Sequence, residues 1–131
     1  MERDPWLTEQ ADDFFEGVFM TAVAPGELLT TVTVPPLAAG QGDGFAAVTI
    51  GKDGTGIVNV AATVKDGSAR IAIGCVAATP VVLTAAADEV AVRDAVRSAH
   101  LDPPSDVHAS ADYRRHVAAV CAVRALREAL A

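Results

Sequence analysis

The sequence predicts an α+β fold, in which an antiparallel sheet of three to four strands is followed by two helices packed on one face of the sheet. Three observations predict it. Apolar runs with alternating side-chain character succeed one another, Asp-Gly hairpin signals separate them, and the apolar period changes to that of a helix beyond Pro80. Because the links between strands are of hairpin length, this order favours an antiparallel sheet over a wound βαβ sheet.

The composition is that of a folded domain, and it argues against membrane insertion and nucleic-acid binding. The 131 residues are 51% hydrophobic with a mean hydropathy of +0.32, but charged residues interrupt every apolar run before the roughly 18 residues that span a bilayer. Ten Lys and Arg oppose 17 Asp and Glu, and the net charge of -7 is opposite in sign to a phosphate-binding surface. The first residues lack the pattern of a secretory signal, so we expect a cytoplasmic protein.

Residues 1–27 are predicted to form an acidic, loop-like segment. They also hold most of the aromatic side chains, at Trp6, Phe14, Phe15 and Phe19. Large rings seldom lie in water without another surface to cover them. We therefore expect this segment to pack against a further surface.

Four segments are predicted to be strands. The first, Leu28–Val34, follows a Pro-Gly turn and ends at Pro35, and a flexible connector, Leu37–Gly44, comes after it. The other three strands are Phe45–Ile50, Ile57–Val64 and Ala69–Val76. Asp53-Gly54 and Asp66-Gly67 stand between them, and this dipeptide accepts the positive φ angles of tight hairpin turns. The sequence therefore predicts an antiparallel meander.

Two helices are predicted near the C-terminus. Asp88 caps a helix that runs to about Ala99, and Ser110 opens a last helix that reaches the end of the chain. The apolar positions of the last helix form two overlapping stripes, so we expect it to be buried on more than one side. These positions are Tyr113, Val117, Val120, Cys121, Val123, Leu126 and Leu130.

No catalytic side chain and no metal site is predicted. Cys75 is placed in mid-strand and Cys121 in mid-helix, where a cysteine usually packs as a small hydrophobe rather than acting as a nucleophile or forming a disulfide. The nearest pairs of metal-ligating residue types, Asp106 with His108 and Asp112 with His116, have no third ligand beside them. An independent hydrolase or metalloenzyme is therefore not favoured.

Two features remain as candidates for binding. The loop Gly51–Gly56 brings backbone amides, a hydroxyl and the Lys52 cation together, so it could approach an anion or a ring closely, or it could simply be a hairpin loop. Arg114 and Arg115 lie in the first turns of the last helix, where the helix dipole disfavours cations. We expect an external carboxylate or a partner chain to compensate them.

Several motifs occur in the order found in one protein family. They are Asp12-Asp13-Phe14-Phe15-Glu16-Gly17, Pro25-Gly26-Glu27-Leu28-Leu29-Thr30, Ile57-Val58-Asn59-Val60-Ala61-Ala62, Ile71-Ala72-Ile73-Gly74 with Thr79-Pro80-Val81, and Ser105-Asp106-Val107 with Ala109-Ser110-Ala111-Asp112-Tyr113-Arg114-Arg115-His116. A chain with these motifs resembles the C-terminal portion of the FAD-binding medium subunit of molybdenum hydroxylases of the carbon monoxide dehydrogenase and xanthine dehydrogenase type. The resemblance covers nearly the whole chain from about residue 12.

The resemblance implies a division of the chain. Residues 1–36 would be the tail of an FAD-binding domain that is otherwise absent, and residues 37–131 would be the C-terminal domain. This domain would wall the isoalloxazine side of the FAD pocket with its hairpin loop. The implied cofactor-binding residues are Gly51, Lys52, Gly54, Thr55, Gly56 and Ile57.

The implied function is that of an accessory domain without catalytic side chains of its own. In the family, electrons pass from molybdenum through iron-sulfur clusters to FAD. The implied partners are the FAD-binding domain, the iron-sulfur subunit and the molybdenum cofactor subunit, and a homo-oligomer is compatible with them. We expect weak or no FAD binding by the chain alone. The alternative is a stand-alone binding or assembly module without redox activity.

Overall fold

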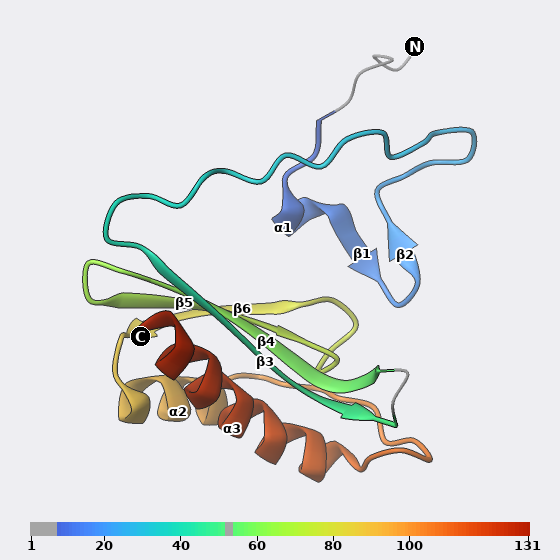
Figure 1. Cartoon of the computed structure of the whole chain (residues 1–131). Helices are drawn as coiled ribbons and strands as arrows, with labels where there is room; N and C mark the ends of the chain where they lie inside the picture. Colours follow the sequence, from blue (N-terminus) through green and yellow to red (C-terminus); the bar gives the residue numbers. More distant parts are fainter. Residues whose placement is uncertain (1–7, 52–53) are drawn as a thin grey trace. The chain divides into compact units, whose positions relative to one another are not determined.

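The computed structural model describes residues 8–51 and 54–131 (Figure 1). The chain divides between Pro35 and Pro36 into two compact units, which are described separately. The elements are α1 (Ala11–Phe14), β1 (Phe15–Gly17), β2 (Met20–Thr21), β3 (Gly42–Ile50), β4 (Thr55–Lys65), β5 (Ser68–Gly74), β6 (Val81–Ala86), α2 (Glu89–Ser98) and α3 (Ala111–Ala129). The predicted α+β class is confirmed.

The first unit contains more regular structure than expected near its start and less near its end. One helical turn, α1, leads into the β1–β2 hairpin, whose turn includes Phe19 at φ 56°. The predicted strand Leu28–Val34 is wrong: this segment has no strand, and its side chains are exposed. A β-branched run forms a strand only where another strand satisfies its backbone groups, and no described strand pairs with it.

The second unit is built on a four-stranded antiparallel sheet of order β3-β4-β5-β6. The predicted meander is confirmed, and Asp66 and Gly67 both have positive φ in the tight turn between β4 and β5. The Gly-rich connector is shorter than expected, because β3 already begins at Gly42. The fourth strand is not Leu28–Val34 but β6, which pairs with β5 from Ser68–Ala86 to Ile73–Val81.

Both predicted helices form with the predicted caps. The Asp88 carboxylate accepts hydrogen bonds from the backbone N–H groups of Val90 and Ala91, at 3.0 and 2.9 Å, and begins α2. The Ser110 hydroxyl accepts one from the Tyr113 N–H at 3.2 Å and begins α3. Both helices pack on one face of the sheet (Figure 1). None of the helices in the described ranges is long and apolar enough to cross a membrane.

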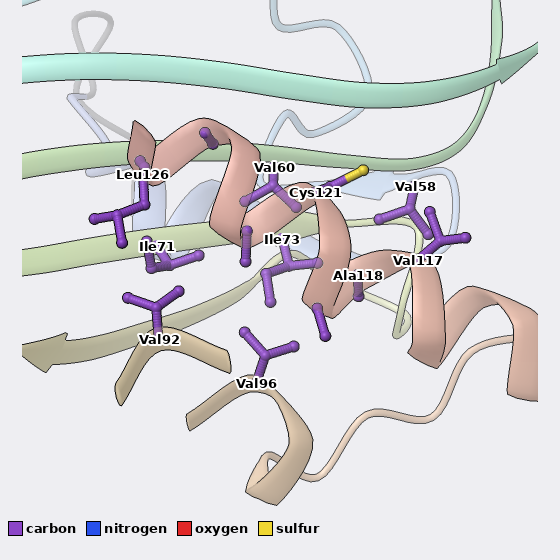
Figure 2. Close-up of a cluster of buried hydrophobic side chains, with 14 of the residues drawn as sticks. Val58, Val60, Ile71, Ile73, Val92, Val96, Val117, Ala118, Cys121 and Leu126 are labelled. Carbon is purple, nitrogen blue, oxygen red and sulfur yellow. The ribbon is translucent and has the colours of Figure 1, made fainter. Parts of the chain in front are cut away.

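The core lies between the sheet and the two helices. Figure 2 shows how alternate residues of β4 and β5 point toward α2 and α3. The core residues labelled there are Val58, Val60, Ile71, Ile73, Val92, Val96, Val117, Ala118, Cys121 and Leu126. As expected, α3 is buried on more than one side, although Tyr113 and Leu130 at its ends are exposed.

Helix α3 approaches β3 closely because glycines line the facing side of the strand. A Cβ atom at Gly42 would lie 1.9 Å from the Ala129 carbonyl oxygen, and one at Gly44 would lie 2.0 Å from the Ala125 carbonyl oxygen. Beside this contact, the Glu128 carboxylate accepts a hydrogen bond from the Phe45 N–H at 2.9 Å. The start of β3 is therefore fixed by the backbone and one side chain of α3.

We predict that Gly44→Ala destabilises the chain by about 1–3 kcal/mol, because the helix backbone must move to admit the methyl group. Gly56→Ala is the matched control, since a Cβ there would lie 3.7 Å from the nearest atom, an ordinary contact distance. We expect the control to change stability by less than about 1 kcal/mol. Urea denaturation measures both free energies of unfolding, and equal effects would contradict the close packing.

Candidate functional site

The loop between β3 and β4 lies at one end of the four-stranded sheet. Gly51 and Gly54 have φ angles of 63° and 78°, and no atom of the described residues lies within 4 Å of a Cβ at either position. Thr55 begins β4 and is followed by Gly56 and Ile57. The structure thus brings five of the six predicted cofactor-binding residues together, and Lys52 lies outside the described residues. The exposed backbone at Gly51 and Gly54 is available to a flat or anionic ligand.

A β-bulge forms the root of this loop. Val48 pairs with Val58, whereas Thr49 pairs with Gly56, so Ile57 is an extra residue in β4. Ile57 and Val58 are consequently buried in succession, at 6% and 0% exposure, in a strand that otherwise alternates. Pairing with β5 begins only at Asn59. The backbone of Ile57 therefore has no register partner in either neighbouring strand.

The Arg114 guanidinium reaches the bulge from the first turn of α3. Nη1 donates to the Ile57 carbonyl oxygen, and Nη2 donates to Asp106 Oδ2 at 2.7 Å. Arg114 is only 4% exposed, and its Nε is buried without a hydrogen-bond partner among the described residues. One side chain thus connects the helix, the root of the loop and the segment before α3.

Asp106 is itself held in place by its own loop. Its Oδ1 accepts hydrogen bonds from the backbone N–H groups of His108 and Ala109, at 2.9 and 3.0 Å. These two bonds, together with the charge of Arg114, hold the pKa of the Asp106 carboxyl below its usual value. The Ser105 hydroxyl accepts from the Ala111 N–H at 2.8 Å, which orders the other end of the loop.

The arginine prediction was right about the need for carboxylates and wrong about their source. Arg114 pairs with Asp106, and Arg115 pairs with Asp112 at 2.9 Å, so both partners belong to this chain. The two carboxylates that were considered as metal ligands are therefore engaged with arginines. Within the described ranges, no three His, Cys, Asp or Glu side chains converge as they would around a metal ion.

A small polar cluster beside the loop was not predicted. Asn59 Nδ2 lies 3.7 Å from Cys75 Sγ, and a Cβ at Gly74 would lie 2.3 Å from Asn59 Oδ1, so this side chain covers the glycine. The prediction that Cys75 is a buried mid-strand residue is wrong, because β5 ends at Gly74 and Cys75 is exposed with φ 66°. Cys121 is buried as predicted, and burial raises the pKa of its thiol.

The two best-defined hollows of the second unit have volumes of about 170 and 270 Å³ and lie along α2 and α3, lined in part by Arg97 and Arg124 respectively. Neither hollow is lined by a residue of the β3–β4 loop. Ligand pockets usually measure roughly 300–1,000 Å³. The β3–β4 loop could therefore form one wall of a cofactor site, whereas a complete cofactor pocket would need a second surface.

Comparison with known proteins identifies relatives over most of the chain. A family model described as the CO dehydrogenase flavoprotein C-terminal domain matches residues 44–129. The carbon monoxide dehydrogenase medium chain of Afipia carboxidovorans is 33% identical over 136 aligned residues, which cover 92% of this chain and 47% of that protein. The chain spans about half the length of this relative.

Solved structures show the same similarity. The carbon monoxide dehydrogenase of Hydrogenophaga pseudoflava that lacks the Mo-pyranopterin moiety matches 91% of this chain and 47% of its own, with a TM-score of 0.79 and 28% identity. Reconstituted CO dehydrogenase from Oligotropha carboxidovorans matches 89% of this chain and 46% of its own, with a TM-score of 0.76 and 30% identity. Quinoline 2-oxidoreductase from Pseudomonas putida 86 matches 89% of this chain and 46% of its own, with a TM-score of 0.71 and 27% identity.

We predict that Asp106→Asn destabilises the chain in a pH-dependent way. Because the pKa of Asp106 is lower in the folded state, the ionised carboxylate stabilises the fold above the ordinary aspartate pKa of about 4, and this contribution is lost as the pH falls through the folded-state pKa. Urea denaturation at a series of pH values, from neutral to below the ordinary aspartate pKa of about 4, measures the effect. The difference from the wild type should be largest at neutral pH.

The exposed Asp102 provides the control for this prediction, as Asp102→Asn. Its difference from the wild type should be small across the same pH range. If the Asp106→Asn difference stayed constant down to the lowest pH, the carboxylate would not be the stabilising group.

Proposed function

Because the chain belongs to the family of CO dehydrogenase flavoprotein C-terminal domains, we propose that it is an accessory domain of a molybdenum hydroxylase, which completes the FAD pocket of a flavin-carrying neighbour. The observation that carries this proposal is the β3–β4 loop. It is a glycine-rich turn at one end of the sheet, its positions at Gly51 and Gly54 are open, and the Ile57 carbonyl oxygen at its root accepts a hydrogen bond from Arg114. It suits a wall against which a ring can lie, and neither of the two best-defined hollows of the second unit is lined by a residue of this loop.

The loop residues contribute to this site mainly through their backbone. Gly51, Gly54 and Gly56 let the chain approach a ligand closely, and Thr55 and Lys52 complete the predicted set. The Ile57 side chain is part of the core and its carbonyl oxygen accepts from Arg114, so Ile57 acts by fixing where the loop ends. FAD, when bound by the neighbour, supplies the redox chemistry, and these residues orient its surroundings.

Residues 1–36 extend this proposal to the first unit, as the tail of the FAD-binding domain, with residues 37–131 as the C-terminal domain. The support is an unusual number of exposed apolar side chains in so short a segment. Phe15, Phe19, Met20, Leu28, Leu29, Val32 and Val34 are all at least half exposed or close to it. A concentration of exposed apolar side chains in one segment is typical of an interaction site.

In the assembled enzyme, electrons would pass from the molybdenum cofactor subunit through an iron-sulfur subunit to FAD, in the cytoplasm. The chain would contribute contacts with these subunits and no catalytic group. A stand-alone binding or assembly module is the second candidate, because the second unit has a hydrophobic core of its own.

We predict that the isolated chain does not bind FAD with micromolar affinity, since it offers one wall of a pocket and not the whole. Titration of FAD with the chain, followed by flavin fluorescence, measures this. Stoichiometric binding at micromolar concentration would contradict an accessory role. The same titration is then repeated with the part of the A. carboxidovorans medium chain outside the match, loaded with FAD. Association of the chain with this FAD-loaded part favours the proposal. If the chain binds neither FAD alone nor this part, the stand-alone module is favoured.

We predict that Phe19→Asn weakens this association about tenfold, because exposed aromatic residues often dominate binding surfaces. Asn tolerates the positive φ of this position, so the free energy of unfolding of the isolated chain should not change. The control is Val107→Asn, because Val107 is also an exposed apolar residue but belongs to the second unit. This variant should bind as the wild type does. If Phe19→Asn bound with the affinity of the wild type, the turn between β1 and β2 would not be part of the interface.

A further inference from the structure

We propose that Arg114 is a positioning residue, which sets the direction of the β3–β4 loop by holding the carbonyl group of the bulged Ile57. This inference rests on the proposed function of the loop and adds a residue that lies 57 positions further along the chain. Arg114 would not touch the flavin. It would act through the backbone on which the flavin-facing residues stand.

The bulge makes this contact necessary. Ile57 has no register partner in β3 or in β5, and its side chain lies in the core. A buried carbonyl group without a hydrogen bond is costly, so a bulge of this kind needs a donor from elsewhere. Arg114 supplies that donor from α3. Without it, the end of the β3–β4 hairpin could relax toward regular pairing, which would rotate the residues that follow the loop.

The donor is rigid because it is anchored at its other nitrogen. The planar guanidinium uses Nη1 for Ile57 and Nη2 for Asp106, and Asp106 is fixed in turn by the N–H groups of His108 and Ala109. A lysine offers one point charge on a flexible stem and cannot reproduce this two-armed geometry. The geometry therefore depends on arginine, and a positive charge alone is insufficient.

Packing alone does not account for this residue. Burying a guanidinium with an unpartnered Nε is expensive, and this cost is offset by the two hydrogen bonds that the side chain makes, to the Ile57 carbonyl oxygen and to Asp106. At the described ends of the loop, a Cβ at Gly51 or Gly54 would meet no described atom within 4 Å, so side-chain packing does not fix these two positions. Arg114 instead fixes the carbonyl group of Ile57, at the bulge that follows the loop.

The first test measures backbone amide hydrogen exchange in the full chain. For Arg114→Lys and for Asp106→Asn, we expect exchange at residues 48–50 and 55–58 to accelerate about tenfold, while the amides of Ile71 and Ile73 in β5 stay as slow as in the wild type. Arg115→Gln is the control, because its partner Asp112 is exposed, and it should change neither region. Equal acceleration in both regions, or none near the loop, would overturn the inference.

The second test separates positioning from association. The FAD-loaded part of the A. carboxidovorans medium chain is mixed with each variant, and affinity and flavin fluorescence are measured together. We expect Arg114→Lys to retain the wild-type affinity and to lose most of the fluorescence change. If Arg114→Lys accelerates hydrogen exchange near the loop but produces the same flavin fluorescence change as the wild type, the inference about Arg114 is overturned and the proposed function is not. A wild-type chain that leaves the flavin signal unchanged would overturn the proposed function, while hydrogen exchange would still test the Arg114 contact.

Discussion

The structure depends on the close contact between an alanine-rich helix and the strands beneath it. Helix α3 buries ten residues, among them Ala118, Ala122 and Ala125, and it approaches β3 where Gly42 and Gly44 leave space for its backbone. Small side chains on both elements let the helix backbone lie nearly on the sheet. The place of α3 then determines where Arg114 emerges and which strand ends it can reach. The candidate site is therefore a consequence of this packing.

The second unit was largely predictable because its signals are local. Alternating burial in β4 and β5, the Asp66-Gly67 turn and the two helix caps each depend on neighbours within a few residues. The wrong predictions concern segments that become strands only if a neighbouring strand pairs with them. Leu28–Val34 carries a good strand pattern but pairs with no described strand, whereas β6, with a weaker pattern that ends in alanines, pairs with β5. Local propensity cannot choose between such segments.

The sequence predicts that the candidate site is a loop, but it does not predict the contacts that hold the end of this loop in place. Glycine and aspartate marked the turn between β3 and β4, and the family motifs directed attention to it. The bulge at Ile57 and its bond to Arg114 join residues far apart in sequence, so no spacing rule reveals them. The position of Arg114 near a helix start did indicate that it needs a carboxylate. That this carboxylate is Asp106, from the segment before the helix, followed only from the fold.

The hydrogen bond from the Phe45 N–H to Glu128 has a consequence for self-association. Strand β3 lies at one edge of the four-stranded sheet, where free N–H groups would normally invite an additional strand from another molecule. An incoming strand would have to displace a charged acceptor that is fixed on α3 and then leave that carboxylate without its donor. The Glu128 carboxylate thus opposes the addition of a strand at Phe45, and β6 forms the opposite edge of the four-stranded sheet.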